Sequence, residues 1–600
     1  MNFKRLFNDI NIESTDKFYL VLLLCFSILL TVVLVKFNNT RGAFNPDIYA
    51  YLAGALEVSG LNVNGIQGAM WIQNSPVIIF LTSLLFRLGF VDINAIFIVT
   101  GVFGILGIMG MYVFLKIRFS PLLSFAGSIL FCSLSLTLYY FANGMLDIPA
   151  VSLIIWTLIF TVAASNKNYK YYVLVAFLFC MTFFVRFTTA YIISLILLYF
   201  LKDHDIINLI ECLFKDRNNF KQRIFGFIKS NEFKWISISV IFGICIFLIV
   251  LKILFNYHSD LSYFYMAQSS MNGFSNPNDV NHVYDNWFYI KNFMNFLSSY
   301  FIVFNEQSTE LFLNVTPLSY MLIILLLIGF LLKSVNVFKN LNSKQITFRT
   351  KNSTYILILC IIILLFVSIV GFNINYMISL VCLFSIYIIL LSLIKTFPIN
   401  KDLFALSLMC FALFSFYLVI VSYVDLKCAR YLLPAFPAFI YFEIYCIDYI
   451  LNYINTGFDN ENSLLKKFRK PNLDYNFDSK SVFKRKITKF IPILFILICL
   501  MFTFNFTNTV EINQDHLDRI EFTDFIKQYD SDYQSKTFMG FRELRIFEWY
   551  LNKDILKWGS DVKEKNSINQ DYIITEVITI DYPNYKEVYH LGKYHLYEHK

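Results

Sequence analysis

Long apolar runs recur along the whole chain, and they constrain its fold more than any other feature. About twenty consecutive apolar residues span the hydrocarbon core of a bilayer. Thirteen stretches approach that length, at about 18–36, 93–115, 119–140, 148–165, 170–185, 187–201, 235–255, 311–332, 353–371, 374–395, 403–424, 430–451 and 488–506. Only 15% of the residues are charged, against about 25% in soluble domains. The sequence therefore predicts an all-α polytopic membrane protein with about thirteen transmembrane helices.

One further apolar stretch, Pro76–Phe90, is shorter than the others and contains Arg87. Lys and Arg concentrate in cytoplasmic loops, so basic residues report the orientation of a membrane protein. If Pro76–Phe90 does not span, the N-terminus and the basic loops 333–352 and 452–487 lie on one side. We therefore interpret this stretch as a helix at the external interface. The predicted orientation places the N-terminus in the cytoplasm and the C-terminus outside the cell membrane.

Three polar segments on the predicted external side are large enough to build a site. They are residues 37–92, 256–310 and 507–600. The first contains Asn45-Pro46-Asp47, in which Asn can cap a helix and Pro can occupy its first position. We expect a helix over Pro46–Ser59 that ends at Gly60 and, being only moderately apolar, lies on the membrane.

The other two external segments differ in character. Loop 256–310 is rich in aromatic residues and we expect it to close over the site, while its His258 and His282 are more typical of polar loops than of ligands. After a transmembrane domain over residues 1–506, residues 507–600 predict a small α+β domain. Its expected elements are helices near Leu517–Tyr529 and Leu544–Asn552 and strands at Tyr572–Ile580 and Tyr585–Glu598, the last a hairpin about Leu591-Gly592-Lys593.

Charged side chains at the predicted external boundary are the candidate site residues. They are Asp47, Asp147, Arg186, Lys427 and Arg430. An ionisable group at the edge of the apolar region is costly, so each is a hypothesis of function. Asp147, followed by Pro149, could equally cap the helix that it begins. The basic residues could instead snorkel, or pair with Asp147 or Asp425.

These five charges gather at one membrane face, which suggests a chemistry. Arg offers a planar fork for a phosphate, and two arginines with a lysine suit a phosphate anion. A lipid phosphate could lodge its chain between helices and its head at the cations, leaving a carboxylate to face an acceptor. The arrangement fits group transfer from a lipid-linked donor.

The stretch from Pro46 to Gly60 resembles the first external loop of GT-C glycosyltransferases, which include protein O-mannosyltransferases and the aminoarabinose transferases of bacterial lipid A. The family pattern places Tyr four and Ala eight residues after the Asp, and Tyr51 and Ala55 hold those places here. Pro76, Asp147-x-Pro149, Arg186 and the segment Arg430-Tyr431-Leu432-Leu433-Pro434-Ala435-Phe436-Pro437 are also similar to family features, in the same order. The layout agrees over about the whole chain.

The resemblance implies an inverting transfer of a sugar from a polyprenyl phosphate to a hydroxyl of a protein, lipid or glycan. Asp47 would be the general base, and Asp147 would orient the acceptor or Asp47, or balance the cations. The lipid phosphate would meet Arg186, Lys427, Arg430 and Tyr431. The implied partners are the donor, the acceptor and the bilayer, without nucleic acid.

Two departures from the family pattern bear on cofactors and class. Ile48 replaces the usual Glu after Asp47, and Asn74 and Ser75 replace the charged residues before Pro76, so no metal ligand is assigned and a divalent metal stays open. No Trp-Trp-Asp motif occurs, which argues against an oligosaccharyltransferase. A lipid-linked sugar transporter or flippase, and a surface-polysaccharide polymerase or ligase, are the alternative functions.

Overall fold

The computed structural model describes most of the chain. The described residues are 13–42, 45–62, 65–66, 68–204, 217–257, 285–304, 310–342, 352–393, 400–424, 427–468, 478–540, 544–557, 569–576 and 584–600. His258, His282 and Asp425, which the sequence singled out, lie outside these ranges.

Helices dominate the fold. The α-helices are α2 (Ser14–Arg41), α3 (Asp47–Ser59), α4 (Pro76–Arg87), α5 (Asn94–Lys116), α6 (Pro121–Ser133), α7 (Ser135–Tyr140), α8 (Asp147–Asn166), α9 (Tyr172–Val185), α10 (Ile192–Leu201), α12 (Arg217–Ile228), α13 (Asn231–Tyr257), α15 (Phe288–Lys291), α16 (Phe293–Leu297), α17 (Pro317–Asn342), α18 (Asn352–Phe372), α19 (Tyr376–Leu393), α20 (Lys401–Tyr423), α21 (Phe436–Phe468), α22 (Asp478–Asn505), α23 (Gln514–Tyr529) and α24 (Arg545–Leu551). The 3-10 helices are η1 (Ala69–Asn74), η2 (Tyr169–Tyr171), η3 (Phe187–Tyr191), η5 (Ala429–Ala435) and η6 (Phe506–Asn508). The strands are β1 (Ser299–Phe304), β2 (Glu310–Val315), β3 (Phe538–Gly540), β4 (Leu556–Lys557), β5 (Tyr572–Thr575), β6 (Tyr585–Leu591) and β7 (Tyr594–His599).

The predicted spans are present as helices, so the chain is a multi-pass membrane protein. Within the described residues, ten helices are long and apolar enough to cross a membrane. The remaining predicted spans correspond to the shorter apolar helices Pro121–Ser133, Tyr169–Val185 and Phe187–Leu201. The span expected over 119–140 is divided, because Leu134 adopts an extended conformation between α6 and α7. The start expected at 311 is wrong, because residues 310–315 form β2 and α17 begins at Pro317.

α8 is the centre of the bundle. Of its apolar window 89% is buried, against 11% for α13 and α18, whose apolar side chains face outward as expected beside lipid. Gly107 and Gly110 of α5 lie against Ser152 and Trp156 of α8, respectively, where a Cβ would stand 3.0–3.4 Å from those side chains. Small residues at these positions let the two helices approach closely.

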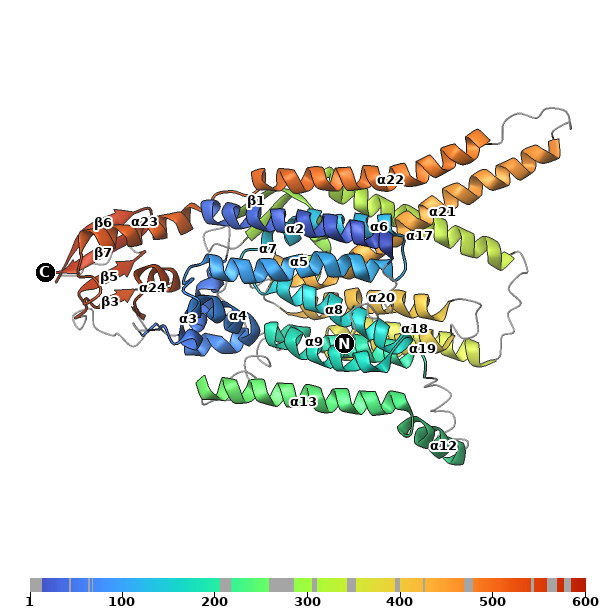
Figure 1. The fold of residues 1–600 in the computed structure, drawn as a ribbon, viewed down its shortest axis with the longest axis horizontal. Helices are drawn as coiled ribbons and strands as arrows, with labels where there is room; N and C mark the ends of the chain where they lie inside the picture. The colour runs from blue at the N-terminus through green and yellow to red at the C-terminus, as the bar shows by residue number, and fades with distance from the viewer. Residues whose placement is uncertain are drawn as a thin grey trace.

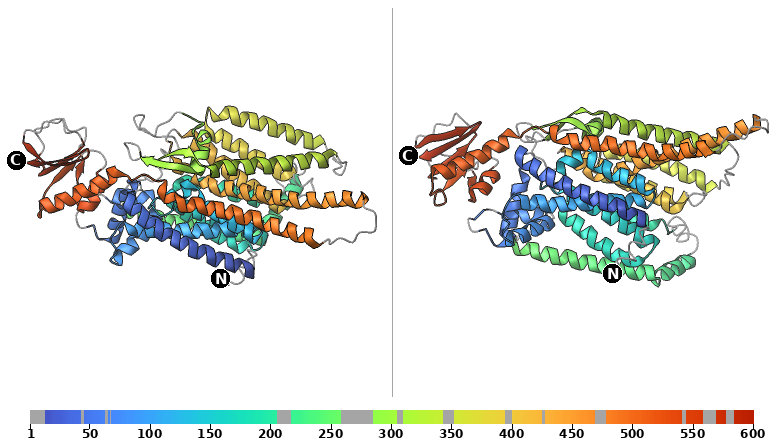
Figure 2. Two further views of the ribbon diagram at one scale, coloured as in Figure 1. Left: turned by 90° about the horizontal axis from the view of Figure 1, so that it is seen from above. Right: turned by 45° about the horizontal axis from the view of Figure 1, so that its top comes forward.

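The two ends of the bundle carry different structures (Figure 1). At one end lie α3, α4 and a five-stranded sheet of order β4-β3-β5-β7-β6. At the other end the long ends of α21 and α22 extend beyond the bundle (Figures 1 and 2), and α12 follows the corresponding end of α13 at the side. The projecting ends of α21 and α22 contain most of the basic segment 452–487, so the charge asymmetry used to predict orientation runs along the long axis of the molecule.

The C-terminal sheet is mixed and has its own apolar core. β3 pairs in parallel with β4 and β5, while β7 pairs in antiparallel fashion with β5 and β6. The predicted helices appear as α23 and α24, and the predicted hairpin as β6 and β7 with Gly592 at φ 57° in its turn. Phe522, Phe538 and Leu596 are among the residues packed between this sheet and its helices.

Candidate active site

Asp47 opens α3, close to where the sequence predicted. Pro46 is the residue before the helix rather than its first member, and Asn45 Oδ1 accepts a hydrogen bond from the Asp47 amide at 2.9 Å. The helix ends at Gly60, whose φ of 75° a residue with a Cβ would adopt only at a cost. The unpaired amides of a helix N-terminus favour a carboxylate at this position.

Two arginines from distant parts of the chain face the Asp47 carboxylate. Arg430 Nη2 lies 3.2 Å from Oδ2, and Arg545 Nη1 lies 3.7 Å from Oδ1. The Asp47 side chain is 40% exposed, whereas that of Arg430 is 16% exposed. The carboxylate is thus held by cations on both oxygens and is still open to an approaching molecule.

Asp147 pairs with Arg186 in the interior. The side chains are 1% and 11% exposed, respectively, and the contact joins Arg186 Nη1 to Asp147 Oδ1. Asp147 is the first residue of α8 rather than its cap, and no side-chain capping bond forms there. Of the alternatives that the sequence left open, pairing of the arginine with Asp147 is therefore the one observed.

Tyr431 connects the two charged pairs. The Arg186 guanidinium lies 5.1 Å and the Arg430 guanidinium 5.7 Å from the centre of its ring, distances typical of cation–π contacts. The neighbouring Tyr51 of α3 is buried; burial raises the pKa of its phenol, and the Asp47 carboxylate raises it further. The Tyr51 phenol therefore keeps its proton at neutral pH.

Lys427, the third cation that the sequence proposed for the lipid phosphate, contacts the end of α20 in this structure. Its ammonium is buried and donates hydrogen bonds to the carbonyls of Val421, Ser422 and Val424 at the end of α20, the one to Ser422 at 2.7 Å. It also lies 5.8 Å from the centre of the Tyr289 ring. A lysine commonly satisfies the last carbonyls of a helix in this way. The structure thus brings together Asp47, Asp147, Arg186, Arg430 and Tyr431, and uses Lys427 as a cap.

Sequence reasoning missed two charged residues at this site. Arg545 comes from α24, and Glu310 begins β2, where it accepts a hydrogen bond from the Tyr139 hydroxyl at 3.4 Å. Burial raises the pKa of Glu310, while Arg430 opposes that effect. Arg545 stands in the polar C-terminal segment, where a charge is unremarkable, whereas Glu310 directly precedes the span predicted from 311 and could have been selected by its boundary position.

No metal centre is found in the part of the chain that the structure describes. There, no group of three or more His, Cys, Asp and Glu side chains could hold an ion. The carboxylates of Asp47 and Asp147 form ion pairs with the side chains of Arg430 and Arg186, respectively.

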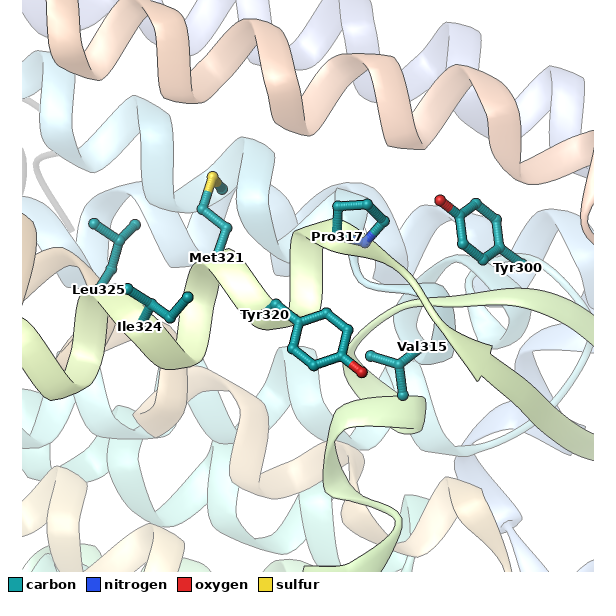
Figure 3. A pocket seen from close by; sticks show the side chains of 7 residues that line it. All are labelled: Tyr300, Val315, Pro317, Tyr320, Met321, Ile324 and Leu325. Carbon is teal, nitrogen blue, oxygen red and sulfur yellow. The ribbon is translucent and has the colours of Figure 1, made fainter.

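An open apolar groove lies beside the β1–β2 hairpin (Figure 3). Its volume is about 550 Å³, and it is lined by Tyr300, Val315, Pro317, Tyr320, Met321, Ile324 and Leu325. The lining residues come from β1, the end of β2 and the first turns of α17. The same strand β2 begins with Glu310, so the groove and the charged site share one structural element.

A multi-pass helical bundle that carries α3 and α4 at one end is the layout that the resemblance to GT-C glycosyltransferases predicted. Residues 73–211, which include Asp147 and Arg186, match the family of dolichyl-phosphate-mannose-protein mannosyltransferases. The fold is similar to that of ArnT from Cupriavidus metallidurans bound to undecaprenyl phosphate, with a TM-score of 0.50, 10% identity and 98% of each chain covered. The same protein in the apo state gives a TM-score of 0.42 and 11% identity over 94% of this chain and 93% of that chain. No curated protein matches the chain.

Proposed function

We propose that this protein is an inverting glycosyltransferase that moves a sugar from a polyprenyl phosphate to a hydroxyl of a protein, lipid or glycan at the outer membrane face. The observation that carries the proposal is the Asp47 carboxylate, half-exposed and held between guanidinium groups at the end of the bundle. The family match over residues 73–211 and the ArnT-like fold support the same class of reaction.

In the proposed reaction, Asp47 acts as general base. The acceptor hydroxyl gives its proton to the carboxylate as its oxygen attacks the anomeric carbon. The bond from that carbon to the phosphate oxygen breaks, and the electron pair leaves with the polyprenyl phosphate. A single displacement of this kind inverts the anomeric configuration.

The arginines beside Tyr431 would stabilise the leaving phosphate. Arg430 and Arg186 face opposite carboxylates across one aromatic ring, so an incoming phosphate can draw both guanidinium groups toward itself. Recruitment of Arg430 would release Oδ2 of Asp47 as the donor binds. Lys427 would contribute indirectly, by fixing the end of α20. The apolar groove offers a surface suited in chemistry to an isoprenoid chain.

The experiment compares wild-type protein with Asp47→Asn in washed membranes supplied with polyprenyl-phosphate mannose labelled in the sugar. Loss of transfer by at least about a hundredfold is expected, as for removal of a general base. Lys586→Gln, an exposed position on β6, is the matched control and should transfer normally. Unimpaired transfer by Asp47→Asn would refute the proposed role. Movement of intact donor across the bilayer without cleavage would favour the flippase alternative.

A further inference from the structure

We infer that Arg545, contributed by the C-terminal region, is a positioning residue for Asp47 that fixes Oδ1 and leaves Oδ2 as the atom that takes the proton. The inference rests on the proposed function and adds to it a residue and an atom. It starts from the geometry of the carboxylate, in which Arg545 Nη1 faces Oδ1 at 3.7 Å and Arg430 Nη2 faces Oδ2 at 3.2 Å.

α24 packs directly against α3, which gives Arg545 a fixed platform. The Tyr49 hydroxyl of α3 lies 3.2 Å from His516 Nε2 and donates a hydrogen bond of 3.2 Å to the Tyr550 hydroxyl. The Trp549 ring lies 6.1 Å from the Phe86 ring of α4. A small cavity of about 10 Å³ lies between α3 and α24, lined by Tyr49, Arg545 and Trp549 among other residues. The contact is therefore tight, and the site of Asp47 is formed from both regions of the chain.

The residues around this contact keep it in one arrangement. His516 is 2% exposed, and burial lowers its pKa to about 3, so the ring is neutral at physiological pH. Its Cδ2 atom would stand 3.0 Å from a Cβ placed on Gly42, whose φ is 58°. The Asn513 amide donates to the Arg41 carbonyl at 2.9 Å, which joins the end of α2 to the start of α23. Glu548 of α24 also lines the space between α3 and α24, and burial raises its pKa to about 7, so the platform contains one acid that titrates near neutrality.

The two arginines differ in what else they can reach. Arg430 is 16% exposed and also contacts Tyr431, the ring that it shares with Arg186. Arg545 is 34% exposed and approaches from the C-terminal side. A donor phosphate at the arginines beside Tyr431 competes with Asp47 for Arg430, not for Arg545. When Arg430 turns to the phosphate, Arg545 remains and holds the carboxylate in place.

The proton then has one destination. The O–H bond of the acceptor breaks and an O–H bond forms at Oδ2 of Asp47, while the new glycosidic bond forms and the bond from sugar to phosphate breaks. The guanidinium at Oδ1 neither gives nor takes a proton. Misplacement of a reacting group by about 1 Å can cost a hundredfold in rate, so a carboxylate that lost this contact would react slowly.

The test measures transfer rate as a function of polyprenyl-phosphate mannose concentration for Arg545→Gln, Arg545→Lys and the control Lys586→Gln in membranes. For Arg545→Gln we expect kcat to fall roughly ten- to a hundredfold with donor KM nearly unchanged, because the base and not the phosphate site is disturbed. Arg545→Lys keeps the charge and should recover part of kcat. The melting temperature of each variant is measured in parallel.

Three results would overturn the inference. They are an unchanged kcat in Arg545→Gln, a rise in donor KM that accounts for the whole loss, and an activity in Arg545→Lys no higher than in Arg545→Gln at equal melting temperature. Each is distinct from failure of the proposed function, which Asp47→Asn reports separately. An active Arg545→Gln beside an inactive Asp47→Asn would leave Asp47 as the base and remove Arg545 from its support.

Discussion

The Arg186–Asp147 pair makes a quantitative prediction. Both side chains are buried, at 11% and 1% exposure, respectively. Removing one partner of a buried ion pair leaves the other charge without compensation and typically costs about 3–5 kcal/mol. We expect Arg186→Gln and Asp147→Asn each to destabilise the protein strongly. The double variant Asp147→Asn/Arg186→Gln should recover most of that loss, because it leaves no unpaired charge behind.

Denaturation of the three variants in detergent, followed by intrinsic fluorescence, supplies the free energies of unfolding. The cycle should show a coupling of about 5 kcal/mol, larger than the roughly 0.5–3 kcal/mol usual for residues in contact, because each single variant leaves a buried charge unpaired. Additivity of the two single effects to within about 0.5 kcal/mol would refute the pairing. Transfer activity separates the roles, because the double variant regains stability but still lacks the guanidinium proposed to meet the phosphate.

Two further predictions concern single side chains. Burial, and then the Asp554 carboxylate, raise the pKa of Glu548 to about 7, above its value of 4.5 in the unfolded chain. An acid whose pKa is raised on folding contributes stability that is fully present below pH 4.5 and is lost as the pH rises through 7. Glu548→Gln should therefore match the stability of wild type at pH 4.5 and exceed it at pH 8, by on the order of 2 kcal/mol in denaturant melts. Equal stability of the two proteins at pH 8 would contradict this prediction. Lys427→Met should lower stability by about 1–3 kcal/mol through the carbonyls left unsatisfied at the end of α20, with donor KM unchanged in transfer assays. A large rise in donor KM in Lys427→Met would instead indicate that Lys427 binds the donor phosphate.

Local signals predicted the parts of the fold that depend on neighbouring residues. The apolar runs predicted the transmembrane helices, because the length and composition of a segment are enough to identify a helix that spans the membrane. Asn45 and Gly60 marked the limits of α3, and Gly592 marked the hairpin of β6 and β7. The pattern missed β3 and β4, which have only three and two residues and exist through pairing with each other and with β5.

The candidate site was predicted in part. Asp47, Asp147, Arg186, Arg430 and Tyr431 stand at predicted helix boundaries, where a charge or its neighbour attracts attention, and the structure brings them together. Arg545 meets Asp47 only because α24 packs on α3, a contact between distant parts of the chain that no spacing encodes. The position of Lys427 depends on the direction in which α20 presents its last carbonyls, which the sequence alone does not specify.

The contact of α24 with α3 also sets an order of events during synthesis. Tyr49 and His516 are 467 residues apart, and every predicted span lies between α3 and α23 or just before them. In the proposed orientation, Asp47 reaches the external side early and meets Arg545 only after the whole bundle has been inserted. A nascent chain stopped before residue 545 would lack the guanidinium that lies beside Oδ1 of Asp47, so on the proposed roles it would be inactive.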